Sequence, residues 1–147
     1  MKLRRFMAIG MTVALTATMF SGVSVYAESS DPEPFKIGFP WDTANTDPTW
    51  ISIYNNVKAA VESAGGELVN VVTDNSADGL IDNISELISR DVDGILFMPA
   101  SDSMLPAVDA MCADAGVYWG TMFRTISDDD IREAMYDSEW FAGGCNE

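Results

Sequence analysis

Carboxylate, hydroxyl, guanidinium and tryptophan side chains follow four short apolar runs of this sequence, and these are the residue types that can hold a ligand. Carboxylates and a guanidinium exchange hydrogen bonds with ligand hydroxyl groups, and flat aromatic rings stack on apolar C–H faces. The combination favours a neutral polyhydroxylated ligand such as a sugar. The candidate ligand-binding residues are Trp41, Asp42, Asp47, Thr49, Trp50, Asp74, Ser101 and Arg124, with Asn45, Asn75, Asp102 and Phe123 beside them.

Each of these residues also has a structural interpretation. Asp47 precedes a proline and could serve only as a helix cap. Trp50 falls on the apolar stripe of a predicted helix, so it is as suited to the core as to a ligand, and Trp119 lies within an apolar run typical of a core strand. Arg124 could pair with one of the many acidic residues. The sequence leaves these alternatives open.

Catalysis is not indicated. The chain contains no histidine, which is the commonest general base and metal ligand. No nucleophile elbow, P-loop or dinucleotide fingerprint follows an apolar run, and no pair of acids stands out by its spacing. We therefore expect a binding protein that is not an enzyme, with no catalytic residues, no metal and no cofactor.

The first group of candidate residues lies within 36–66. The sequence predicts a strand, a polar loop and a helix there, and these elements must position the group. Ile37 and Phe39 belong to a short apolar run that predicts a buried strand. Asp47 and Pro48 are typical of a helix start, and a glycine pair at 65–66 ends the helix. Residues that follow a strand in this way lie at the carboxyl end of a sheet, where open α/β sheets bind their ligands.

The same alternation continues through the chain. Strands are predicted at 67–73, 94–98 and 117–123, and apolar stripes predict helices between them. Ser101 and Ser127 are the expected caps of the third and fourth helices, and Trp140 opens a possible fifth strand. Four short strand–helix alternations predict a doubly wound parallel sheet with helices on both faces, because right-handed crossovers place helices on either side.

The first 27 residues have the pattern of a cleaved signal peptide. Lys2, Arg4 and Arg5 precede an apolar run at 7–20 that is too short to span a bilayer, and small residues lead to a cleavage site after Ala27. Residues 28–35 are expected to form a flexible leader. No cysteine near the cleavage site could carry a lipid anchor, so the sequence predicts a periplasmic or secreted protein.

The net charge of the mature chain limits the partners that it can bind. Three of the eight basic residues lie in the predicted signal, so the mature chain has five against 23 acidic residues, a net charge of −18. Such a surface repels nucleic acid and anionic membranes.

The two cysteines, Cys112 and Cys145, could form a disulfide in an oxidising compartment. Cys112, however, falls on the apolar stripe of a predicted helix, where a lone cysteine packs as a small hydrophobe.

Several motifs in order resemble the ribose-type periplasmic sugar-binding proteins of ABC transporters. The resemblance covers residues 36–147 and rests on K-I-G-F, D-P-T-W, V-V-T-D, D-G-I-L-F-M-P-A-S-D and A-G-V-Y-W-G. It implies a parallel sheet of order 2-1-3-4-5 forming one lobe of a normally two-lobed fold, with sugar bound between the lobes. It also implies an extracytoplasmic binding protein that delivers a small-molecule ligand to an ABC permease in the membrane.

Two departures from the family pattern are specific to this chain. Asp47 replaces the amide that usually starts the first helix, while Trp50 keeps the aromatic position. Phe123 precedes Arg124 where the family often has an Asp-Arg pair. Family members are also about twice as long, so 36–147 resembles a truncated N-terminal lobe. Alternative functions are a ligand-sensing subunit for a chemoreceptor or sensor kinase and a flavodoxin-like small enzyme.

Overall fold

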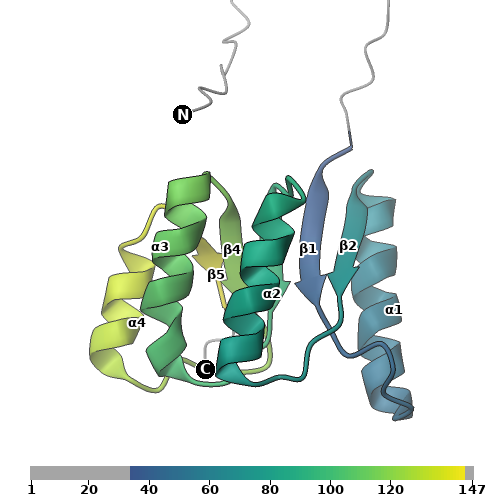
Figure 1. The fold of residues 1–147 in the computed structure, drawn as a ribbon, viewed down its shortest axis with the longest axis horizontal. Coiled ribbons are helices and arrows are strands. Elements are labelled where there is room, and N and C mark those ends of the chain that lie inside the picture. Colours follow the sequence, from purple (N-terminus) through teal and green to yellow (C-terminus); the bar gives the residue numbers. More distant parts are fainter. Residues whose placement is uncertain (1–33, 145–147) are drawn as a thin grey trace, which may run out of the picture. The chain divides into compact units, whose positions relative to one another are not determined.

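Five parallel strands form one sheet in the order β2-β1-β3-β4-β5 in the computed structural model, which describes residues 34–144 (Figure 1). The predicted signal peptide and residues 28–33 of the leader lie outside the described residues. The strands are β1 (Lys36–Pro40), β2 (Glu67–Val71), β3 (Gly94–Phe97), β4 (Tyr118–Thr121) and β5 (Phe141–Gly143). The helices are α1 (Pro48–Ser63), α2 (Ala77–Ser89), α3 (Leu105–Ala115), which follows the short helix η1 (Asp102–Met104), and α4 (Asp129–Tyr136).

Strand β1 lies inside the sheet and pairs with β2 on one side and β3 on the other. Ile37 is in register with Leu68 of β2 and with Gly94 of β3, and Gly94 is in register with Tyr118 of β4. The predicted fold class, a doubly wound α/β sheet of this strand order, is confirmed. Because all five strands run in one direction, their carboxyl ends share the lower edge of the sheet in Figure 1.

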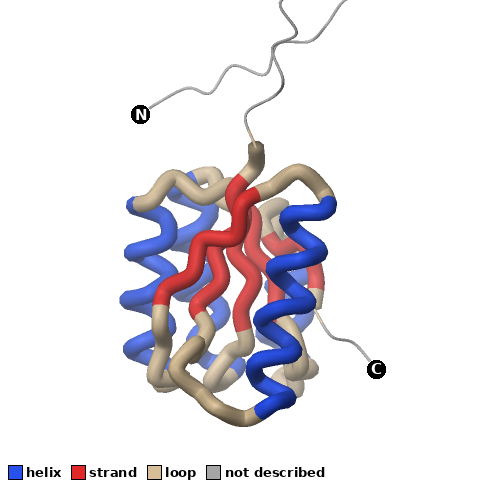
Figure 2. The backbone as a smooth tube through the Cα atoms, turned by 90° about the vertical axis from the view of Figure 1, so that its right-hand side faces the viewer, coloured by secondary structure: helices blue, strands red, loops and turns tan. Residues whose placement is uncertain are grey.

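The helices divide unequally between the two faces of the sheet. Helices α2, α3 and α4 cover one face, and α1 stands on the other beside β2 (Figure 2). The chirality of the crossovers requires this, because only the β1–α1–β2 connection moves towards the β2 edge. The main core lies under α2, α3 and α4 and contains Leu80, Ile84, Leu87, Ile95, Phe97, Val108, Cys112 and Trp119.

Two predicted core residues are confirmed on this side. Trp119 is 1% exposed, and its Nε1 donates to Asp109 Oδ1 at 2.8 Å, so the buried ring has its polar atom satisfied. Cys112 is fully buried, and burial raises the pKa of its thiol to about 12, which keeps the thiol protonated and unreactive. Its proposed partner Cys145 lies outside the described residues.

Some element ends differ from the sequence predictions. Strand β2 ends at Val71 and β4 at Thr121, two residues earlier than expected in each case. The cap of α4 is Asp128, whose Oδ1 accepts from Ile131 N at 3.1 Å; the prediction of Ser127 was wrong by one residue, because the helix begins at Asp129. Ser101 precedes η1, but its side chain makes no capping hydrogen bond.

Candidate ligand-binding site

A small cavity opens at the carboxyl end of β1, where the chain passes into α1. Its volume is about 120 Å³. The loop that forms it is shaped by two short-range hydrogen bonds: Asp42 Oδ1 accepts from Ala44 N at 3.1 Å, and Asn45 Oδ1 accepts from Asp47 N at 2.9 Å. Such side chain-to-backbone bonds hold a turn without regular structure. The cavity is lined by Trp41, Asp42, Thr43, Asn45, Trp50, Ile51 and Tyr54.

Stacked aromatic rings form the wall of this cavity. The Trp41 ring lies 4.9 Å from Phe39 and 4.5 Å from Trp50, centroid to centroid, and Tyr54 stacks on Phe39 at 6.3 Å. Trp41 Nε1 donates to the carbonyl of Trp50 at 3.2 Å, which ties the end of β1 to the first turn of α1. The ring stack therefore sets the position of α1 as well as the shape of the cavity.

The two tryptophans have different access to a ligand. Trp41 is 1% exposed, so its ring supports the wall from behind. Trp50 is only partly buried, and its Nε1 is shielded from solvent without a hydrogen-bond partner among the described residues. A buried indole N–H normally has an acceptor, because leaving one unpaired costs free energy. Trp50 is thus the tryptophan of the stack whose ring is open to a ligand, while its N–H is shielded.

Asp47 and Thr49 lie at the start of α1, next to the cavity. Asp47 Oδ1 accepts from Thr49 N at 2.7 Å, and this backbone hydrogen bond lowers the pKa of the Asp47 carboxyl below 3.8. Pro48 occupies the first turn, as the sequence predicted. Both polar side chains are exposed. The capping interpretation of Asp47 is confirmed.

Asp74 follows β2 and also supports a helix start. Its Oδ1 accepts from Ser76 N at 2.9 Å and from Ser76 Oγ at 2.8 Å, and Ser76 Oγ in turn accepts from Gly79 N at 3.0 Å. The hydrogen bond from the Ser76 backbone is the main reason why the pKa of Asp74 is lowered. A Cβ at Gly79 would lie 2.3 Å from Asp74 Oδ1, so a larger residue there would displace the Asp74 carboxylate from its present position.

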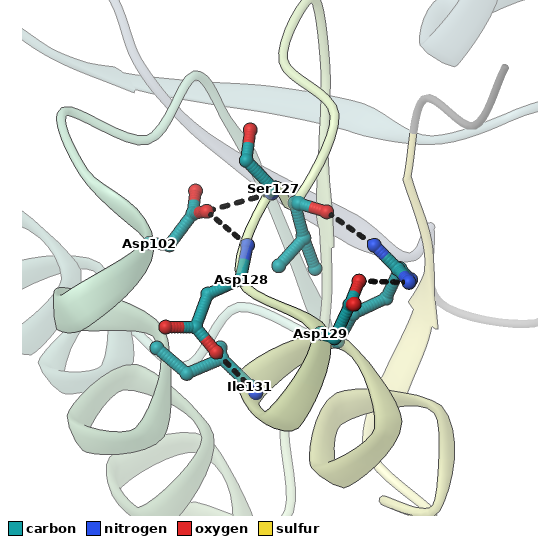
Figure 3. Close-up of polar contacts among 7 residues, drawn as sticks. Asp102, Ser127, Asp128, Asp129 and Ile131 are labelled. Atoms are coloured by element: carbon teal, nitrogen blue, oxygen red, sulfur yellow. Dashed lines mark hydrogen bonds and ion pairs between the residues drawn. The ribbon is translucent and has the colours of Figure 1, made fainter.

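The loops after β3 and β4 are joined to each other. Arg124 Nη1 donates to the carbonyl of Ala100 at 2.7 Å. Asp102 Oδ2 accepts from the backbone N–H of Ser127 at 2.7 Å and of Asp128 at 3.0 Å (Figure 3). These hydrogen bonds hold the segment after β4 against the segment after β3. The hydroxyl oxygens of Ser101 and Ser103 lie 3.0 Å apart in the same loop.

The structure thus gathers part of the predicted set into one cavity and distributes the rest along the same edge. Trp41, Asp42 and Trp50 line the cavity. Asp47 and Thr49 border it, while Asp74, Ser101 and Arg124 belong to the neighbouring loops and do not line it. The sequence analysis did not select Thr43, Ile51 and Tyr54; the signal for Tyr54 was its position four residues after Trp50, which places both rings on one side of the helix.

Within residues 34–144 no group of acidic or cysteine side chains is placed to hold a metal ion. In that same part of the chain no helix is long and apolar enough to cross a membrane.

Comparison with known proteins finds solved structures with a similar fold but no matching sequence family. No protein-family model and no curated protein matches the sequence. Solved structures of ABC transporter solute-binding proteins do match the fold. One from Mycobacterium smegmatis, with bound glycerol, is 21% identical and covers 65% of this chain and 33% of its own, with a TM-score of 0.56.

Two further solute-binding proteins match to the same degree. The protein from Actinobacillus succinogenes, with bound D-allose, is 18% identical over 68% of this chain and 35% of its own, with a TM-score of 0.57. The protein from Bacillus halodurans, with bound myo-inositol, is 21% identical over 70% of this chain and 36% of its own, with a TM-score of 0.53. The chain spans about a third of the length of these structures. At this identity the likeness shows the fold: the described residues form a single lobe of the kind found in periplasmic sugar-binding proteins.

Proposed function

We propose that the protein is an extracytoplasmic solute-binding protein whose carboxyl-edge site holds a neutral polyhydroxylated small molecule, a sugar or a close analogue, without converting it. The cavity between β1 and α1 carries this proposal. Its wall is a stack of aromatic rings that includes the partly exposed Trp50, and Asp42 and Asn45 are among its polar lining residues. Rings that pack on C–H groups beside hydrogen-bonding side chains are the features that hold hydroxylated rings.

Three observations support this proposal. The fold is that of solute-binding proteins whose structures contain glycerol, D-allose or myo-inositol. The predicted signal peptide favours a place outside the cytoplasm. The formal net charge of the whole chain, −15, disfavours strongly anionic ligands and nucleic acid. In this proposal the ligand passes to an ABC permease in the membrane.

The size of the cavity sets the expected affinity. At about 120 Å³ it is smaller than the roughly 300–1,000 Å³ of typical small-molecule sites. It can enclose only part of a monosaccharide, so it serves as one wall of a larger site. We therefore expect a dissociation constant on the order of 1 mM or weaker for this chain alone.

Tryptophan indole N–H signals offer a direct test. The purified protein is titrated with D-allose, myo-inositol, D-glucose and glycerol, and the indole cross-peaks are followed by ¹H–¹⁵N NMR. The Trp50 signal should shift in a saturable way with at least one of these polyols, because its ring lines the cavity. The Trp119 signal should stay in place, because its N–H is bound to Asp109 on the other face of the sheet.

Two variants of Trp50 separate its possible contributions. Trp50→Phe keeps a ring for stacking and loses the N–H, so it should bind more weakly than the wild type and more tightly than Trp50→Ala. The proposal is overturned if no polyol in the panel produces a saturable shift of any indole signal at concentrations up to about 100 mM, well above the expected dissociation constant.

A further inference from the structure

The face of the sheet on which α1 lies (the α1 face) is covered by that single helix among residues 34–144. Helix α1 packs against β2, and no described helix stands on this face over β3 and β4 (Figure 2). Strand register places Leu96 of β3 and Tyr118 of β4 on the uncovered half. Leu96 is partly buried, and the Tyr118 ring is 53% exposed. Because parallel sheets normally have cover on both faces, this half is an apolar surface that can accept a partner.

Helix α1 also has apolar surface that its own sheet does not cover. None of its 16 residues is buried. Ile53, Val57 and Val61 belong to its apolar side, and each is only partly buried. A helix packed between a sheet and solvent normally buries its apolar stripe. The incomplete burial of α1 therefore fits a helix that has a second packing partner.

The α1 face is nearly neutral, whereas the opposite side of the sheet is acidic. Helices α2, α3 and α4 together contain eight acidic residues and one arginine. Helix α1 contains one lysine and one glutamate, Lys58 and Glu62, whose charged groups lie 3.8 Å apart and offset each other. The whole chain has a formal net charge of −15. A second copy of the chain therefore meets the least repulsion when it approaches the α1 face.

The shape of this face is complementary to itself. One half carries the projecting helix α1, and the other half, over β3 and β4, carries no helix of the described part of the chain. A second copy related by a two-fold axis parallel to the strands would place its α1 over β3 and β4 of the first copy. The α1 of the first copy would then fill the same space on the second. Two-fold interfaces bring the same surface of both copies together in this way.

We infer that two copies of the chain associate through their α1 faces about such an axis, with α1 of each copy packed on β3 and β4 of the other. This inference goes beyond the proposed function and does not depend on it. Tyr118 is the main contact expected on β4, since its exposed ring is supported by Trp140 at a centroid distance of 5.3 Å. Tyrosine rings that are held in place before binding are frequent among the residues that contribute most to an interface.

Sedimentation velocity of the purified protein measures the association. We expect a monomer at about 1 µM and a dimer at about 500 µM, with a dissociation constant on the order of 10–100 µM. The affinity is modest because each copy contributes only part of one face and both copies carry a net negative charge. Added salt should tighten the dimer by screening the repulsion between the acidic helices. A reductant is present throughout, so that Cys145 cannot link two chains covalently.

Two charge substitutions form a matched pair. Tyr118→Lys places a charge on the proposed interface and should weaken the dimer by at least about tenfold, because a two-fold interface contains the substitution twice. Tyr136→Lys adds the same charge to a ring that is 47% exposed on α4, on the opposite side of the sheet. It should change the dissociation constant by no more than about twofold. Equal dissociation constants for the two variants would overturn the inference, since only net charge would then matter.

NMR of the wild type at increasing protein concentration locates the interface without any substitution. Over the same concentration range, amide signals of α1, β3 and β4 should shift, and those of α3 and α4 should stay in place. Shifts confined to α3 and α4 would place the contact on the acidic helices and overturn the inference. A protein that remains monomeric throughout also overturns it; if that monomer takes up no apolar dye, another part of the same chain covers the face.

Discussion

Polar side chains at the carboxyl edge of the sheet make hydrogen bonds to the protein's own backbone. Asp47 and Asp74 each accept backbone N–H groups at the start of a helix, and Arg124 donates to a carbonyl of the adjacent loop. Such internal bonds fix the orientation of the side chain, and a side chain fixed in advance loses less entropy when a ligand binds.

Capping by Asp47 leads to a prediction about acid stability. The pKa of Asp47 is lower in the folded state than its unfolded value of 3.8, so the ionised carboxyl stabilises the fold above pH 3.8. This stabilisation is lost as the pH falls through the lower pKa of the folded state. Asp47→Ala should lower the urea midpoint at about pH 7, and the gap to the wild type should narrow towards about pH 3. Urea unfolding followed by circular dichroism at the two pH values measures both effects.

Asp47→Asn is the matched control for this prediction. Asparagine caps a helix about as well as aspartate but does not titrate. Its urea midpoint at about pH 7 should stay close to that of the wild type. Equal midpoints for Asp47→Ala and Asp47→Asn at that pH would contradict the capping role.

Residue types and spacing did not predict the contacts of the site. Trp41 and Trp50 both follow β1 in the sequence, and spacing alone could not show that the first is 1% exposed while the second has an unpartnered N–H. That difference depends on the stacking of Phe39 against Trp41, a contact between side chains two residues apart on one face of the strand. The positive φ of Phe123, 62°, has no sequence signal either, because bulky residues seldom adopt it.

At the level of elements, α1 differs from the other long helices. None of its 16 residues is buried, whereas Leu80, Ile84 and Leu87 of α2 are each at most 1% exposed. The ring stack of Trp50 and Tyr54 on Trp41 and Phe39 holds the first half of α1 near the sheet, and α1 also contacts β2. A helix with few buried contacts opens at lower free energy than the rest of the molecule.

Hydrogen exchange should therefore distinguish α1 from α2. We expect amide protection factors in α1 to be lower than in α2 by on the order of tenfold or more. Trp50→Ala should lower protection in α1 further and leave α2 unchanged, because the two helices lie on opposite faces of the sheet. Ile51→Ala, at a neighbouring side chain that is 46% exposed, is the control and should have a smaller effect. Equal protection in both helices would show that α1 opens only with the whole fold.

Strand and helix order followed from the sequence because hydrophobic periodicity and turn residues determine it locally. The ends of the elements did not. Strand β2 stops early because the chain turns after it: Asn75 N, for example, donates to Thr73 Oγ1 at 3.0 Å. The cap of α4 was misassigned by one residue, because two neighbouring residues, Ser127 and Asp128, both have capping side chains and only Asp128 caps in the structure.

At the scale of the molecule, one face of the sheet has little cover within residues 34–144. Three helices pack on the face that holds the main core, and α1 alone stands on the other, beside β2 (Figure 2). Strand register places Ile37, Leu96 and Tyr118 on the α1 face, and Tyr118 is 53% exposed. Parallel sheets normally carry helices on both faces, and their strands are accordingly apolar on both sides. The alternation of strands and helices predicted such a sheet, but not how unevenly its faces are covered.

This uneven cover predicts that the folded protein binds an apolar dye. Apolar side chains of β3 and β4 that are incompletely covered form a surface of the kind that takes up 8-anilinonaphthalene-1-sulfonate (ANS), although the net charge of −15 opposes the approach of this anion. Dye fluorescence should therefore rise with added salt, which screens the repulsion. Tyr118→Lys, which places a charge on this face, should lower the fluorescence per bound dye and the number of dyes bound.

Tyr136→Lys on α4 is the control. The Tyr136 ring is 47% exposed on the covered side, so the substitution adds the same charge without altering the α1 face. An equal response of the two variants would mean that the dye is attracted by charge alone, and the α1 face would then not be an apolar surface open to solvent.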